Sequence, residues 1–123
     1  MSSPLRILLV DDNSVNVELF RDVLESDGHA VTVERDGIAG QDRALAEPFD
    51  LFLLDIQLPG LDGYALCRAL RASGVDRPII AVSSAAMADD IRRGAEAGFD
   101  EYLTKPIAPA AIRAAVRRHG GGA

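Results

Sequence analysis

Asp11, Asp12, Asp55 and Lys105 have side chains that could together bind a cation and a small anion. Lys105 is the only lysine, and the other 12 of the 13 basic residues are arginine. A lysine ammonium is a compact point charge on a flexible stem, whereas arginine presents a wide planar fork. A compact charge suits a small anion that binds and leaves, such as a phosphoryl group. The alternative is a surface lysine without a role, and the placement of the acidic residues bears on this choice.

The candidate residues Asp11-Asp12, Asp55 and Ser83 directly follow mainly apolar runs at residues 5–10, 50–54 and 78–82. Runs of this kind are typical of strands that are covered on both faces. Lys105 follows a short strand expected at residues 101–104. Because the carboxyl ends of parallel strands meet at one edge of a sheet, we expect these side chains to lie together.

The elements that must position these residues alternate regularly along the chain. A further strand is expected at 30–34, and helices are expected from Asn13 or Ser14 to Asp27, then over 36–47, from about 63 to 74, 86–97 and 109–119. Five strands alternating with five helices indicate a parallel sheet with helices on both faces, joined by right-handed crossovers. In the strand order 2-1-3-4-5, strands one and three are neighbours where the order reverses, which is where ligands bind.

Helical periodicity predicts which side chains of three helices face the sheet. For the first helix these are Val15, Leu19, Phe20, Val23 and Leu24; for the third, Leu66, Cys67 and Leu70; for the fourth, Met87, Ile91 and Ala95. Cys67 is accordingly expected to serve packing rather than redox chemistry. The arginines of the last helix, Arg113, Arg117 and Arg118, are expected to form a solvated face.

Length and composition favour one globular domain over residues 1–123, with a core at about 4–119 and a flexible tail at 120–123. Apolar residues make up 48%, and the net charge of −6 disfavours non-specific binding to nucleic acid. The sequence has no run long enough for a membrane span, no recognisable signal peptide and a single cysteine. These features predict a cytoplasmic location without membrane insertion.

Three carboxylates in one crevice repel one another, and either a divalent cation or partial protonation relieves this repulsion. Hard oxygen ligands favour Mg²⁺, which usually keeps several waters and leaves room for phosphate oxygens. Ser83 and Lys105 would supply donors from the other side of the crevice. A carboxylate such as Asp55 can also attack phosphorus and form an aspartyl phosphate, a labile group that suits a switch.

The sequence resembles the receiver domain of two-component response regulators over essentially its whole length. The resemblance rests on Asp11-Asp12-Asn13, on Asp55 followed by Leu58-Pro59-Gly60-Leu61-Asp62-Gly63, on Ser83 and on Lys105-Pro106. It implies a flavodoxin-like (βα)5 doubly wound parallel sheet of order 2-1-3-4-5. It also implies structural roles for Pro59 and Gly63, and a cis peptide bond between Lys105 and Pro106.

The resemblance also assigns the site. Asp55 would be the phosphoacceptor, and Mg²⁺, with Mn²⁺ as a possible substitute, would be bound directly by Asp12, Asp55 and the backbone carbonyl of Gln57. Asp11 would act mostly through water, and Lys105 would pair with Asp55 or its phosphoryl group.

The resemblance further implies a conformational switch. The Ser83 hydroxyl would move toward the phosphoryl group, and Tyr102 would swing inward behind it. The small side chains of Ser84 and Ala85 would leave the site open. Two simpler interpretations stay open: Ser83 as a helix N-cap and Tyr102 as an immobile core aromatic.

The expected function is therefore that of a phosphoacceptor signalling protein and not of an enzyme, with some capacity to promote its own phosphorylation and dephosphorylation. The expected partners are a histidine kinase or a histidine phosphotransfer protein, and a downstream protein effector, without direct DNA binding. The fourth helix, fifth strand and fifth helix would report the switch. Two alternatives are a metal-dependent phosphatase, although Gln57 offers no second acid, and a pseudo-receiver, although the acidic site is intact.

Overall fold

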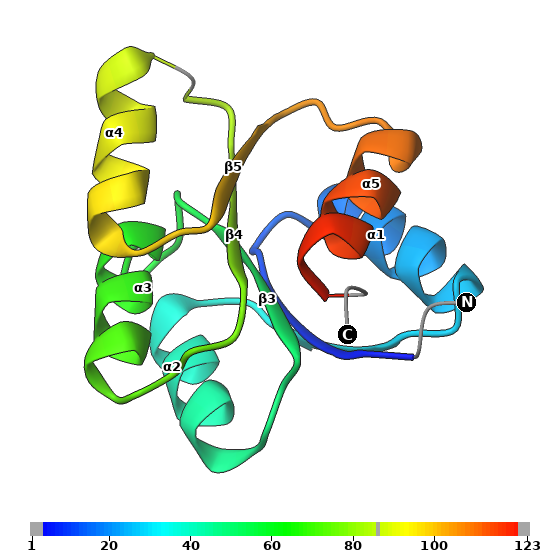
Figure 1. The fold of residues 1–123 in the computed structure, drawn as a ribbon, viewed down its shortest axis with the longest axis horizontal. Coiled ribbons are helices and arrows are strands. Elements are labelled where there is room, and N and C mark those ends of the chain that lie inside the picture. The colour runs from blue at the N-terminus through cyan, green and yellow to red at the C-terminus, as the bar shows by residue number, and fades with distance from the viewer. Residues whose placement is uncertain (1–3, 86, 121–123) are drawn as a thin grey trace.

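A computed structural model describes residues 4–85 and 87–120. The strands are β1 (Arg6–Val10), β2 (Ala30–Glu34), β3 (Leu51–Asp55), β4 (Ile79–Ser83) and β5 (Glu101–Thr104). They form one parallel sheet in the order β2-β1-β3-β4-β5, as the sequence predicts. The helices are α1 (Ser14–Ser26), α2 (Gly37–Ala46), α3 (Gly63–Ala72), α4 (Ala88–Ala97) and α5 (Pro109–Gly120). Figure 1 shows α1 and α5 on one face of the sheet and α2, α3 and α4 on the other.

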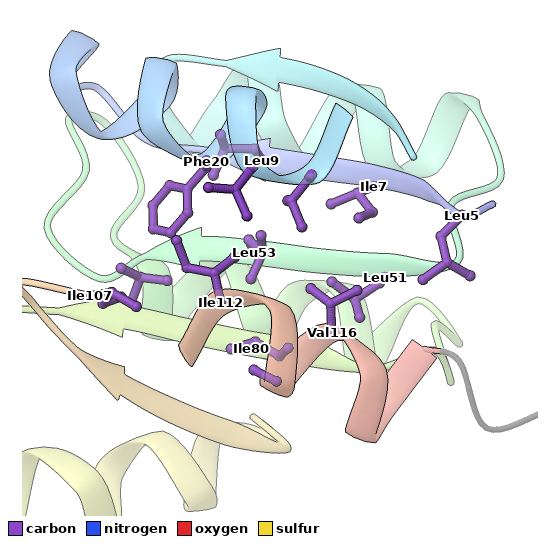
Figure 2. Packing of buried hydrophobic residues seen from close by; sticks show 14 of the residues in the cluster. Leu5, Ile7, Leu9, Phe20, Leu51, Leu53, Ile80, Ile107, Ile112 and Val116 are labelled. Carbon is purple, nitrogen blue, oxygen red and sulfur yellow. The ribbon is translucent and has the colours of Figure 1, made fainter. Parts of the chain in front are cut away.

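The central strands have side chains buried on both faces, which explains their nearly continuous apolar sequences. Toward α1 and α5, the cluster in Figure 2 includes Ile7, Leu9, Leu51, Leu53 and Ile80 from the strands and Phe20, Ile112 and Val116 from the helices. Toward the other helices, the strands contribute Leu8, Val10, Phe52 and Leu54, which pack with Leu66, Cys67 and Leu70 of α3. The predicted inner face of α3 is thus confirmed, and α3 packs directly against the strands of the sheet.

The predicted inner face of α1 is wrong at Val15, which is 74% exposed, whereas Val17 is 3% exposed. Asn13 caps the helix by accepting hydrogen bonds from the backbone nitrogens of Val15 and Asn16 at 3.0 and 3.1 Å. The five residue steps from Val15 to Phe20 turn the helix by ~500°, so Val15 points ~140° away from the buried Phe20.

The predicted inner face of α4 is also wrong, because Met87, Ile91 and Ala95 are exposed and Gly94 and Ala97 face the sheet. The cause is Tyr102 on β5. A Cβ at residue 94 would lie 2.9 Å from Cδ2 of the Tyr102 ring, so only a residue without a side chain fits there. Residue 86, the predicted start of this helix, lies outside the described residues.

The last helix extends one residue further than predicted, through Gly120, and residues 121–123 lie outside the described part. Two of its arginines form ion pairs rather than a purely solvated face: Arg113 with Asp27 at 3.1 Å, and Arg118 with Glu101. None of the helices in the described part of the chain has the length and apolar character needed to cross a lipid bilayer.

Candidate functional site

The predicted acidic residues meet at the carboxyl edge of the sheet. Asp11 and Asp12 follow β1 and Asp55 ends β3, and these two strands are neighbours in the sheet. One carboxylate oxygen from each of the three residues lies within 4.8 Å of the other two. Asp11 and Asp55 are buried, at 0% and 4% exposed, whereas Asp12 is exposed. The crevice is therefore an acidic site with one side open to solvent.

The surroundings of Asp11 disfavour the ionised form of its carboxyl group. Its Oδ1 accepts a hydrogen bond from the Asn13 backbone nitrogen at 2.9 Å, but its buried Oδ2 has no hydrogen-bond partner within the described residues. Burial raises the pKa of Asp11 to about 6, aided by the nearby Asp55 carboxylate and opposed by the Asn13 N–H and the Lys105 ammonium. A buried acceptor without a partner costs free energy unless a cation or proton occupies it.

This donor set fits a Mg²⁺ ion. Three carboxylates offer hard oxygen ligands within 4.8 Å of one another, and the Asp11 oxygen that lacks a hydrogen bond is able to accept one from a bound water. The exposed side of Asp12 leaves room for the waters that Mg²⁺ retains. The backbone nitrogen of Gln57 donates to Asp55 Oδ1 at 3.0 Å, which holds one oxygen of Asp55 in place.

Lys105 reaches across from β5 to this cluster, as the sequence predicts. Its Nζ lies 3.1 Å from Asp55 Oδ2 and 3.6 Å from Asp11 Oδ2, with the lysine side chain 20% exposed. The peptide bond between Lys105 and Pro106 is cis. The site thus places one partly exposed ammonium group beside the two buried carboxylates of Asp11 and Asp55.

Ser83 and Tyr102 are connected through the backbone of Ala85. The Ala85 nitrogen donates to Ser83 Oγ at 3.0 Å, and the Tyr102 hydroxyl donates to the Ala85 carbonyl oxygen at 2.6 Å. Ser83 is fully buried and Ser84 is exposed. A shift of the Ser83 hydroxyl would therefore pull on the same residue that the tyrosine holds.

The loop after β3 closes the site from the α3 side. A Cβ at Gly63 would lie 2.5 Å from the carbonyl oxygen of Asp55, so the loop needs glycine at this point of close approach. The Pro59 carbonyl accepts hydrogen bonds from the backbone nitrogens of Gly37 and Leu61 at 3.2 and 3.0 Å, which connects the loop to α2. The close approach at Gly63 excludes a side chain there, and the hydrogen bonds at Pro59 involve only its backbone carbonyl.

Asn13, one of the two predicted caps of the first helix, is confirmed as the cap of α1, and its backbone nitrogen also donates to Asp11. Sequence reasoning missed two contributors near the site. Ala85 contributes its backbone rather than only a small side chain. Tyr64 contacts α4 through its hydroxyl and its ring. Only Tyr64 had a usable signal, an aromatic residue at the start of a helix next to the candidate site.

The family model described as "Response regulator receiver domain" matches residues 7–117. The chain belongs to the receiver domain family of response regulators. Among curated relatives, it is 42% identical to the transcriptional regulatory protein CseB of Streptomyces coelicolor, over 99% of this chain and 54% of CseB. It is 41% identical to the sensor protein GacS of Pseudomonas syringae pv. syringae, over 83% of this chain and 12% of GacS.

Solved receiver domains have the same fold. The receiver domain of sensor histidine kinase PA1611 from Pseudomonas aeruginosa PAO1 superposes with a TM-score of 0.89 at 37% identity, covering 98% of this chain and 100% of that one. That structure is described as having a magnesium ion coordinated in its active-site cleft. The BeF3-activated receiver domain of DrrB gives a TM-score of 0.87 at 27% identity, covering 94% of this chain and 97% of that one.

These relatives limit what carries over to this receiver domain. The chain spans about half of CseB and about an eighth of GacS, so activities of those whole proteins are not properties of these 123 residues. Because CseB is named a transcriptional regulatory protein, the comparisons give no support to the expected absence of DNA binding. They place this chain in a family of signalling domains rather than in a classical enzyme family.

Proposed function

We propose that this receiver domain accepts a phosphoryl group on Asp55 from a phosphohistidine of a histidine kinase or a histidine phosphotransfer protein. The observation that carries the proposal is the position of the Asp55 carboxylate, which contacts the Lys105 ammonium at 3.1 Å and clusters with two further aspartates at the open edge of the sheet. The likeness to receiver domains, one of which is described with magnesium in its cleft, supports the same reaction.

In the proposed reaction, a carboxylate oxygen of Asp55 attacks phosphorus and the phosphorus–nitrogen bond of the phosphohistidine breaks. The imidazole nitrogen keeps the electron pair, and the product is an acyl phosphate on Asp55. Lys105 offsets negative charge on the phosphoryl oxygens, and the Gln57 N–H keeps the attacking carboxylate oriented.

Asp11, Asp12, Asp55 and the backbone carbonyl of Gln57 would hold the Mg²⁺ ion, with Mn²⁺ as a substitute. When bound, the ion supplies positive charge that offsets both the crowded carboxylates and the incoming phosphoryl oxygens. The protein's own contribution is to keep these oxygens together and to leave the Asp12 side open for the donor.

The response to phosphorylation passes through Ser83, Ala85 and Tyr102 to α4, β5 and α5. Phosphorylation shifts a pre-existing equilibrium between two arrangements, because the Ser83 hydroxyl binds the phosphoryl group in one of them and the Ala85 amide in the other. The tyrosine follows through its hydrogen bond to Ala85. A downstream protein effector reads the changed surface of α4, β5 and α5.

The test is to incubate the protein with acetyl phosphate, with Mg²⁺ or with EDTA, and to measure its intact mass. We expect an increase of one phosphoryl group with Mg²⁺, none with EDTA and none for Asp55→Asn. The control is Asp76→Asn, which changes an exposed aspartate. An adduct that forms equally well on Asp55→Asn would refute the assignment.

Two further measurements separate the rival functions. Continuous hydrolysis of an unrelated phosphoester, lost in Asp55→Ala, would indicate a phosphatase. A Mg²⁺ titration without binding, together with no adduct, would indicate a pseudo-receiver.

A further inference from the structure

Helix α4 has little side-chain packing of its own against the sheet. Its buried residues among those described are Gly94 and Ala97, while Ile91 is 44% exposed. Small residues bury little apolar area, so they contribute little to holding a helix in place. The position of α4 must therefore depend on contacts that other elements make with it.

Tyr64, in the first turn of α3, makes two contacts with α4 and a third with Phe99, just after this helix. Its hydroxyl donates to the carbonyl oxygen of Asp90 at 3.0 Å, and the Arg93 guanidinium carbon lies 4.3 Å from the centre of its ring. The ring also meets Phe99 edge-on, with centroids 6.5 Å apart. Tyr64 is 4% exposed, and burial together with the nearby Tyr102 raises its pKa to about 12, so the hydroxyl stays protonated and able to donate.

The other end of this connection is the backbone of the phosphoacceptor. Tyr64 directly follows Gly63, whose nitrogen donates to the Ile56 carbonyl oxygen at 2.9 Å and which packs against the Asp55 carbonyl. The start of α3 is thus held closely to the end of β3. A displacement of the chain at Asp55 and Ile56 would move Tyr64, and with it the first turn of α4.

We propose that Tyr64 is a positioning residue that connects Asp55 to α4 through Ile56 and Gly63, in addition to the hydrogen bonds of Ser83, Ala85 and Tyr102. Through its hydroxyl and ring, it holds the first turn of α4 and sets how far this helix responds when Asp55 is occupied. The proposal rests on the function proposed above and adds a residue to the switch. The chemistry is a hydrogen bond and a cation–π contact, and the hydrogen bond is removable without removing the ring.

The test is hydrogen exchange of α4 amides in the wild-type protein and in Tyr64→Phe, with and without beryllofluoride and Mg²⁺. Phenylalanine keeps the ring and loses the hydrogen bond to Asp90. We expect α4 amides to exchange about three to ten times faster in the variant, as the loss of one hydrogen bond implies. We also expect the change in α4 exchange caused by beryllofluoride to differ from wild type by about threefold or more.

The control is Val23→Ala in α1, a buried position on the other face of the sheet. It loses stability without touching α4. Three outcomes would overturn the proposal: unchanged α4 exchange in Tyr64→Phe, faster exchange spread over all helices as in Val23→Ala, or faster α4 exchange with a wild-type response to beryllofluoride. If beryllofluoride does not bind the wild-type protein, the proposed function itself fails, and the role of Tyr64 in switching fails with it.

Discussion

Replacing Asp11 with asparagine should stabilise this protein in the absence of a metal ion. The pKa of Asp11 is raised from 3.8 to about 6 in the folded state, chiefly by burial. The folded protein therefore holds this proton more tightly than the unfolded chain does. The tighter proton binding of the folded state contributes to the free energy of unfolding. This contribution is fully present below pH ~4 and is lost as the pH rises through about 6.

The size of the effect follows from the same pKa values. A rise from 3.8 to about 6 corresponds to about 3 kcal/mol of destabilisation by the ionised carboxylate above pH ~6. Asparagine has nearly the same shape and does not ionise, so it avoids this cost. We expect the free energy of unfolding of Asp11→Asn to be higher than that of wild type by up to about 3 kcal/mol at pH 7.5. At pH 4 the two free energies should be almost equal.

The assay is urea unfolding with EDTA at several pH values between 4 and 8. Asp76→Asn, at an exposed position, is the matched control and should follow wild type throughout. Adding Mg²⁺ should reduce the difference in the free energy of unfolding between Asp11→Asn and wild type at pH 7.5, because a ligand that binds the folded wild-type protein stabilises it by mass action. The reasoning is refuted if Asp11→Asn is no more stable than wild type at pH 7.5, or if its stability has the same pH dependence as wild type.

Three further changes test other contacts. Lys105→Arg keeps the charge, but the wide guanidinium does not fit between Asp55 and Asp11 as the ammonium does at 3.1 and 3.6 Å, so phosphorylation by acetyl phosphate should slow by about tenfold or more; a wild-type rate would contradict this. Arg71→Lys should lower the free energy of unfolding, measured in urea, by about 2 kcal/mol. Arg71 donates hydrogen bonds at 2.8–3.0 Å to three backbone carbonyls, with two of the bonds made to Gly98. An unchanged midpoint of urea unfolding would contradict a stabilising role for these bonds. Gly63→Ala should lower the free energy of unfolding by about 2 kcal/mol in the same assay, because the new Cβ would lie 2.5 Å from the Asp55 carbonyl oxygen. The variant should also bind Mg²⁺ more weakly in a calorimetric titration. A Mg²⁺ affinity equal to wild type would exclude a role of Gly63 in supporting the site.

The sheet and the site edge were predictable because Asp11, Asp55 and Ser83 lie at the ends of buried apolar strands and Lys105 follows the short, partly buried β5. Alternation of strands and helices then places Asp11, Asp55 and Lys105 at one edge, and the structure brings them together. The face of α4 was not predictable in this way. Periodicity indicates that Met87 and Ile91 share a stripe, but only the tertiary contact of Gly94 with Tyr102 decides that this stripe points outward.

The network around Arg71 illustrates a second limit of sequence reasoning. Arg71 is one of 12 arginines, and nothing in its neighbourhood distinguishes it. Its hydrogen-bond acceptors are the carbonyls of Val75, Arg77 and Gly98 and the side chain of Asp100, and the last two are 27 and 29 residues away. Carbonyl acceptors leave no signal in a sequence, because every residue has one.

The single lysine also gives this domain an unusual chemical handle. Since Lys105 carries the only side-chain primary amine, a reagent that acylates amines would modify one side chain, and that side chain lies at the site. Its ammonium contacts Asp55 and is only 20% exposed, so the rate of acylation should depend on what occupies the crevice. Lysine reactivity, followed by mass, would therefore report the state of Asp55, the proposed phosphoacceptor, without a known partner.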